Sequence, residues 1–179
     1  VSEYVRAARE AVGDRKPVWA VIQAFNWADA SQEARRTGWA RWPTYREERC
    51  MAYLAIINGA KGLLFFRYGG EGWHEQANWQ ALKRVARELR EVSPILLEES
   101  PAIPISLAVR PSESNAADRI EFTVRIHGGH LYLFAANNWP GTREATFCFS
   151  TNLHGVVNVL SEKRRIVPDA ARFSDTFAP

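Results

Sequence analysis

Two short apolar runs separated by a helical segment constrain the fold of this 179-residue chain more than any other feature. Residues Pro17–Phe25 and Gly62–Tyr68 are rich in β-branched and aromatic side chains, as are strands that are buried on both faces. Between them, Thr44 and Glu47 form the capping-box pattern that begins a helix. A strand, a helix and a second strand at this spacing predict parallel pairing through a right-handed crossover.

Further helices are predicted on both sides of this unit. Apolar side chains recur at helical spacing over Ser2–Val12, and Gly13 follows as a stop. The helix after Thr44 ends at Asn58-Gly59, and a third helix runs from Asn78 to about Val92, before Ser93-Pro94. Two parallel strands do not form a stable sheet alone. We therefore expect strands missing from this chain, or self-association, to cover their apolar faces.

The pattern changes at Pro101-Ala102, which predicts a second domain over residues 101–179. There, apolar and polar residues alternate, and Gly128-Gly129 between two such stretches indicates a two-residue hairpin. The run Lys163-Arg164-Arg165 is interpreted as a solvated turn. The predicted strands are 103–109, 119–127, 130–136, 144–149, 156–160 and 171–174. They predict a small antiparallel β-sandwich of five or six strands.

Charge and composition argue against several classes of protein. The net charge is +3, but the basic residues are scattered, whereas nucleic-acid binders gather them on one face. No apolar stretch approaches the roughly 20 residues that span a bilayer. Metal-ligand spacings and a phosphate-binding glycine loop are absent, so neither a metal nor a cofactor is expected. Cys50 and Cys148 lie in apolar runs and are expected to be free, which leaves the compartment open between cytoplasm and secretion.

The loops after the two predicted strands are the expected binding region, because ligands of parallel β/α folds bind at the carboxyl ends of the strands. Four of the seven tryptophans lie in these loops, among amide and charged side chains. An indole stacks on the apolar face of a sugar ring while polar groups bind its hydroxyls. The predicted carbohydrate-binding residues are Gln23, Asn26, Trp27, Trp39, Trp42, Arg67, Tyr68, Trp73 and His74. The alternative is that these tryptophans fill the core beneath the loops, the role assigned to Trp19, Trp79 and Trp139.

Two carboxylates in the same loops are candidates for catalysis. Glu71 lies between glycines, which allow a sharp turn that presents a side chain to a cleft, and Asp29 follows the first strand. Either carboxyl group would suit acid/base chemistry on a glycosidic bond. The competing interpretation is that Glu71 is a solvent-exposed loop residue.

Three segments together resemble the end of a (β/α)8-barrel glycoside hydrolase or a hydrolase-like relative. They are KPVWAVIQAF followed by a tryptophan, PTYREERCMAYLAIINGAKGLLFFRY, and a helix that ends in LREVSPIL. In the second half, HLYLFAANNW and RFSDTFAP are similar to the C-terminal domain of such chains. The resemblance implies an α/β part followed by an all-β part. Residues 1–100 would be the last two β/α units of a TIM-type barrel, and residues 101–179 a β-sandwich.

The resemblance also implies hydrolysis of glycosidic bonds by paired carboxylates. The chain departs from the large retaining clan of such enzymes, in which a glutamate ends the seventh strand. Here that position reads Gln23-Ala24-Phe25-Asn26-Trp27, with no carboxylate before Asp29. We therefore expect the catalytic pair on strands outside this chain, which would be inactive alone. The alternative function is a non-catalytic carbohydrate-binding or oligomer-assembly module.

Overall fold

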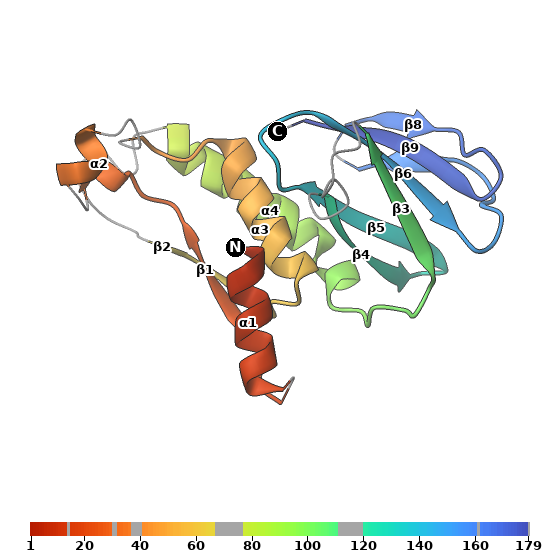
Figure 1. Ribbon diagram of the computed structural model, residues 1–179, viewed down its shortest axis with the longest axis horizontal. Coiled ribbons are helices and arrows are strands. Elements are labelled where there is room, and N and C mark those ends of the chain that lie inside the picture. The colour runs from red at the N-terminus through yellow and green to blue at the C-terminus, as the bar shows by residue number, and fades with distance from the viewer. Residues whose placement is uncertain are drawn as a thin grey trace. The chain divides into compact units, whose positions relative to one another are not determined.

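The computed structural model divides the chain into two compact units, Val1–Glu98 and Glu99–Pro179 (Figure 1). It describes residues 1–13, 15–29, 32–36, 41–66, 77–110, 120–160 and 162–178. Within these ranges, only the backbone is described for Asp29 and Ala34. The boundary lies near the expected change of pattern at Pro101. Each unit is described below by itself.

The first unit contains the predicted helix, strand, helix, strand and helix in that order, and two unpredicted short helices lie in the expected loop, over residues 27–29 and 32–36. Its elements are α1 (Ser2–Val12), β1 (Trp19–Gln23), the short 3-10 helix η1 (Trp27–Asp29), α2 (Gln32–Arg36), α3 (Tyr45–Ile57), β2 (Gly62–Phe66) and α4 (Ala77–Leu96). The predicted bounds of α1 are confirmed, and Gly13 after it adopts the left-handed conformation.

Capping and turn chemistry explain where α3 begins and ends. The Thr44 hydroxyl accepts a hydrogen bond from the Glu47 backbone N–H, and the Glu47 carboxylate accepts one from the Thr44 N–H at 2.8 Å, so the predicted capping box is confirmed. After the helix, Gly59 has a φ of 94°, which favours glycine. Both local signals operate within a few residues, which is why the sequence alone located this helix.

The end of α4 was predicted too early. Pro94 was expected to stop the helix, but α4 continues to Leu96 with Pro94 inside its last turn. Proline lacks the N–H that would bond to the carbonyl of Arg90. The hydroxyl of Ser93 donates to that carbonyl at 2.9 Å instead, so the helix continues for three more residues.

β1 and β2 pair in parallel with Trp19 opposite Gly62 and Gln23 opposite Phe66, which confirms the predicted direction of pairing. Alternate residues of the pair have different surroundings. Ala20 and Ile22 are buried in a core with Val5 of α1 and Ala55 of α3. On the opposite face, the side chains are between 50% and 63% exposed: Trp19, Val21, Leu64 and Phe66.

The predicted fold class, two units of a TIM-type barrel with a β-sandwich, is wrong. Barrel strands are buried on both faces, whereas β1 and β2 are covered on one face only. Among the described residues, the parallel sheet has two strands, and the remaining strands form small antiparallel sheets. The apolar runs indicated strands correctly but did not show which of their faces would be covered. Coverage by further strands or by self-association stays a prediction.

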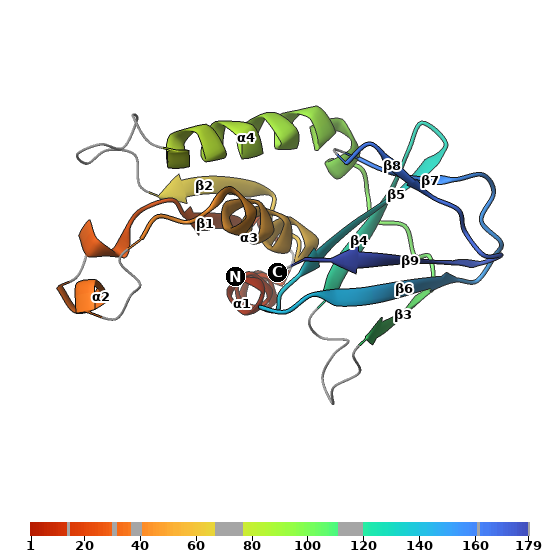
Figure 2. The same cartoon turned by 90° about the horizontal axis from the view of Figure 1, so that it is seen from above.

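A partly buried carboxylate joins α3 to α4, which adjoin in Figure 1 and are seen from above in Figure 2. Glu88 of α4 accepts hydrogen bonds from Tyr53 at 2.7 Å, from Tyr45 at 3.1 Å and from Arg49 at 2.9 Å. Burial by itself would raise the pKa of Glu88, but the hydrogen bonds from Arg49 and Tyr53 outweigh it and hold the pKa below its ordinary value. The Arg84 guanidinium lies 4.0 Å from the centre of the Tyr45 ring and extends the contact.

In the described residues of the second unit, all regular elements are β-strands. Its strands are β3 (Ile105–Arg110), β4 (Ile120–His127), β5 (His130–Asn137), β6 (Arg143–Phe149), β7 (Val157–Val159), β8 (Arg164–Ile166) and β9 (Arg172–Phe177). They form one three-stranded sheet, β3-β6-β9, and two hairpins, β4-β5 and β7-β8, all antiparallel. The hairpin predicted at Gly128-Gly129 is confirmed, and both glycines have positive φ. β8 was missed because its arginines were interpreted as part of a turn.

Phe147 of β6 is the centre of the second core. Its ring is fully buried, with centroids of Phe122, Phe173 and Phe177 at 5.4, 5.3 and 6.3 Å. Phe122 belongs to the β4-β5 hairpin, whereas Phe173 and Phe177 belong to β9. The apolar core therefore joins the hairpin to the three-stranded sheet.

The Glu88 contact predicts a measurable loss of stability in Tyr53→Phe. The variant removes the hydroxyl that donates at 2.7 Å to a largely buried carboxylate, so we expect unfolding to become easier by about 1.5–3 kcal/mol. Urea denaturation measures this change. Tyr4→Phe is the matched control, because Tyr4 is 83% exposed and should tolerate the same change. Equal stabilities of the two variants would contradict the role of Glu88.

The Phe147 core makes a separate prediction for the second unit. Phe147→Ala leaves a cavity at the centre of a cluster of aromatic rings and is expected to cost about 3–5 kcal/mol. Leu131→Ala on β5 changes a side chain that is 38% exposed and should have a smaller effect. Thermal and urea denaturation give the free energy of unfolding of both variants. A larger loss of this free energy in Leu131→Ala than in Phe147→Ala would show that the core lies elsewhere.

Candidate functional site

Three of the predicted carbohydrate-binding residues lie together at the carboxyl end of β1. Gln23 is the last residue of the strand, and its side-chain amide donates to the Phe25 carbonyl at 3.1 Å. The Asn26 side chain accepts a hydrogen bond from the Ala28 N–H at 2.9 Å, which turns the chain into η1. Trp27 is the first residue of η1. Local hydrogen bonds thus fix the backbone that carries both amides and the indole.

An aromatic group formed by Phe25, Trp27 and Phe66 lies beside these amides. The rings of Phe25 and Trp27 meet edge to face with centroids 4.9 Å apart, and Phe25 meets Phe66 in the same way at 5.7 Å. Trp27 is 38% exposed and Phe66 is 52% exposed. The parallel register explains this juxtaposition, because Phe66 is opposite Gln23 at the end of β2.

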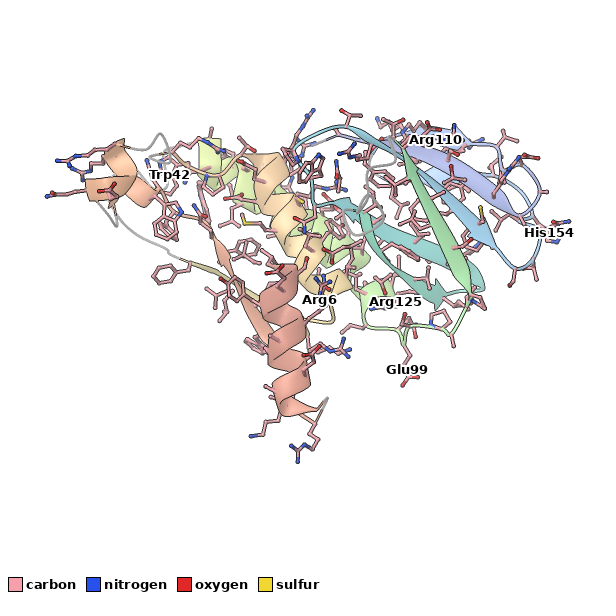
Figure 3. All side chains as sticks on the ribbon, in the orientation of Figure 1. Arg6, Trp42, Glu99, Arg110, Arg125 and His154 are labelled. Carbon is pink, nitrogen blue, oxygen red and sulfur yellow. The ribbon has the colours of Figure 1, made fainter. Side chains whose placement is uncertain are left out.

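Trp42 has a different environment from Trp27. It lies between α2 and α3 and packs against buried Ala24 and Leu82, together with Trp79 (Figure 3). Its indole is half-buried. The described contacts of Trp42 are those of a residue that fills the core beneath a loop, the alternative considered for these tryptophans.

The remaining predicted site residues lie outside the part of the chain that the structure describes. They are Trp39, Arg67, Tyr68, Glu71, Trp73 and His74. Asp29 ends η1, but its side chain also lies outside the described atoms. Their roles in binding or catalysis stay predictions.

Sequence reasoning missed a buried glutamate on α3. Glu48 is 1% exposed, and its Oε2 atom has no hydrogen-bond partner among the described residues. Burial raises the pKa of its carboxyl group to about 7. A signal was present: Glu48, Ala52 and Ala55 are spaced by four and three residues, so the glutamate lies on a helix face that is otherwise apolar and buried.

The neighbouring glutamate has the opposite environment. Glu47 forms a two-pronged ion pair with Arg41, with oxygen–nitrogen distances of 2.6 and 2.8 Å. The hydrogen bond from Arg41 lowers the pKa of Glu47 to about 2. These two consecutive carboxyl groups therefore differ in charge at mildly acidic pH, because one faces a guanidinium at the surface and the other faces the core.

A second buried polar group occupies the matching place on α4. Asn78 is buried, and its Oδ1 atom has no hydrogen-bond partner among the described residues. With Leu82 and Val85 it forms a buried stripe of the same spacing as that of Glu48 on α3. In both helices, the buried face therefore begins with a polar side chain near the N-terminal end of the helix.

The described ranges contain no metal-binding cluster and no membrane-spanning helix. No group of three or more histidine, cysteine, aspartate or glutamate side chains there is arranged to hold a metal ion. No described helix has the length and apolar character required to cross a bilayer. Cys50 and Cys148 do not form a disulfide, as expected from their sequence context.

Comparison with known proteins identifies no relative. No protein-family model matches the chain, and no curated protein or solved structure matches it significantly. The function of the chain is therefore inferred from its own residues.

The turn at Asn26 predicts that its side-chain oxygen holds Trp27 in place. Asn26→Ala removes the acceptor of the Ala28 N–H, whereas Asn26→Asp keeps an oxygen at the same position. We expect the alanine variant to change the near-ultraviolet circular dichroism of the coupled Phe25 and Trp27 rings, and the aspartate variant to preserve it. An unchanged alanine spectrum would show that the turn forms without this bond.

Proposed function

We propose that this chain binds carbohydrate at the carboxyl ends of β1 and β2 and contributes this surface to a glycoside-hydrolase-like protein. The proposal depends on the exposed indole of Trp27, which packs edge to face with the ring of Phe25. The side-chain amides of Gln23 and Asn26 are close to it in the sequence. A flat aromatic ring that is held from one side offers its other surface for stacking on the C–H face of a sugar ring.

The amides supply the second requirement of sugar binding, which is directional hydrogen bonding. Gln23 donates through its nitrogen to Phe25, and Asn26 accepts through its oxygen from Ala28. Each amide also carries a second polar atom with further capacity for hydrogen bonds. Because both side chains are held by the local backbone, little conformational entropy is lost when a hydroxyl binds.

Cleavage of a glycosidic bond needs two carboxyl groups about 5–10 Å apart on either side of the sugar linkage. The two described carboxyl groups at the start of α3 do not provide this arrangement, because Glu47 caps the helix and Glu48 is buried. The proposed reaction would therefore use carboxylates outside the described residues, with Glu71 and Asp29 the candidates in this chain.

A non-catalytic carbohydrate-binding module is the second candidate function. It is favoured by the same observation, since the described aromatic group and amides suit binding but include no acid/base pair. The two functions differ in outcome: a binding module leaves an oligosaccharide intact, whereas a hydrolase releases shorter sugars.

Trp27→Ala is expected to weaken sugar binding at least tenfold, about 1.4 kcal/mol, because the stacking surface is lost. The probes are cellohexaose, xylohexaose and maltohexaose, titrated by calorimetry against the 179-residue chain, with chromatography of the sugars afterwards. Trp27→Phe should retain part of the affinity. Tyr4→Ala removes an exposed aromatic residue from α1 and should bind as the wild type does.

Two results would overturn the proposal. One is a wild-type chain that binds none of the three sugars, and the other is a Trp27→Ala variant with unchanged affinity. Binding with all sugars recovered intact would favour the module over the hydrolase.

A further inference from the structure

α3 places Glu48 beneath the candidate site. Ala55 of α3 packs in one core with Ala20 and Ile22 of β1. Glu48 precedes Ala55 by two helical turns on the same face, which is about 10 Å along the axis. Because α3 is the crossover between parallel strands, it runs antiparallel to β1. Glu48 therefore lies toward the carboxyl end of the strand, the end that carries Gln23.

The described elements packed around Glu48 bring no opposite charge to it. β1 and β2 contain no charged residue. On α1, Arg6 and Arg9 contact Asn58, at the other end of α3. On α4, Glu88 and Arg84 contact α3 through Tyr45, Arg49 and Tyr53. The exposed Lys83 lies over the ring of Trp79 on its own helix.

This environment favours the neutral form of the Glu48 side chain. An ionised carboxylate that is removed from water, without a cation or hydrogen-bond donors, costs several kcal/mol. The Oε2 atom lacks a donor among the described residues. The pKa of about 7 agrees with this geometry.

We propose that Glu48 is a buried proton-binding switch, neutral in the folded unit at mildly acidic pH, whose ionisation loosens the packing of α3 on β1 beneath the candidate site. In the switch, the O–H bond of the carboxyl group breaks, the proton passes to water, and the carboxylate keeps the electron pair. The negative charge then lies in an apolar core, so conformations that admit water become favoured over close packing.

The sign of the pH effect follows from proton linkage. In the unfolded chain, the carboxyl group has the ordinary glutamate pKa of 4.5, and in the folded unit the pKa is about 7. Between these values, the folded state binds the extra proton. Stability therefore falls as pH rises through this window, and the full penalty is present above about pH 7.

Urea denaturation at pH 5, 6, 7 and 8 tests the switch. For the wild type, we expect the Glu48 contribution to lower the folded-to-unfolded ratio on the order of a hundredfold between pH 5 and pH 8. Glu48→Gln keeps the shape without the ionisation and should lose this part of the pH dependence. Glu3→Gln, on the exposed side of α1, is the matched control and should keep it. Equal pH dependence in wild type and Glu48→Gln would overturn the proposal.

A second measurement needs no variant. Carboxyl ¹³C resonances of the glutamates in the wild-type chain report each titration directly by nuclear magnetic resonance. One folded-state glutamate should titrate near pH 7, while Glu47 and Glu88 titrate below the ordinary value. If every glutamate titrates below about pH 5.5, the switch does not exist.

The effect of the switch on sugar binding rests on the proposed function. Cellohexaose, xylohexaose and maltohexaose affinities should fall between pH 6 and pH 8 in the wild type and stay level in Glu48→Gln. Level wild-type affinities, with the predicted ¹³C titration present, would show that ionisation does not reach the site. If no sugar binds at any pH, the proposed function is wrong. The denaturation and ¹³C experiments test the proton switch independently of that result.

Discussion

The packing of α3 against two different neighbours is the constraint on which the first unit depends. One face of the helix, with Ala55, is buried against β1, and another face brings Tyr53 and Arg49 to Glu88 of α4. The small side chain of Ala55 allows close approach of helix and strand. The carboxylate with three donors fixes which side of α3 meets α4. These contacts hold the crossover and thereby set the parallel direction of the strands.

Parallel pairing in turn decides where the candidate site lies. It brings the ends of β1 and β2 to one edge, where Phe66 joins the aromatic group of Phe25 and Trp27. Because α3 runs antiparallel to β1, the buried Glu48 at the start of α3 lies toward the same end of the strand as Gln23. The proposed binding surface and the proposed proton switch are thus consequences of one arrangement, although separate experiments test them.

The sequence predicted elements better than it predicted their assembly. The capping box at Thr44 and Glu47, the hairpin at Gly128-Gly129 and the bounds of α1 are local features, and all are found as expected. The barrel was wrong because an apolar run such as 17–25 has the same composition whether one face or both faces of the strand are covered. Glu48 was missed because it sits next to Glu47, whose capping role was the more evident signal.

By itself, the sequence determined the helix caps, the turns and the alternation of strands with helices, since each of these depends on bonds between residues close together in the chain. It also placed Gln23, Asn26 and Trp27 at the end of a strand. Only the tertiary structure decided that Trp42 is packed while Trp27 is exposed, and that Glu88 accepts hydrogen bonds from two tyrosines and an arginine. It also decided that Glu48 is buried, with no hydrogen-bond donor to its Oε2 atom among the described residues. These properties depend on contacts between residues distant in sequence, and burial and pKa are set by those contacts rather than by residue type.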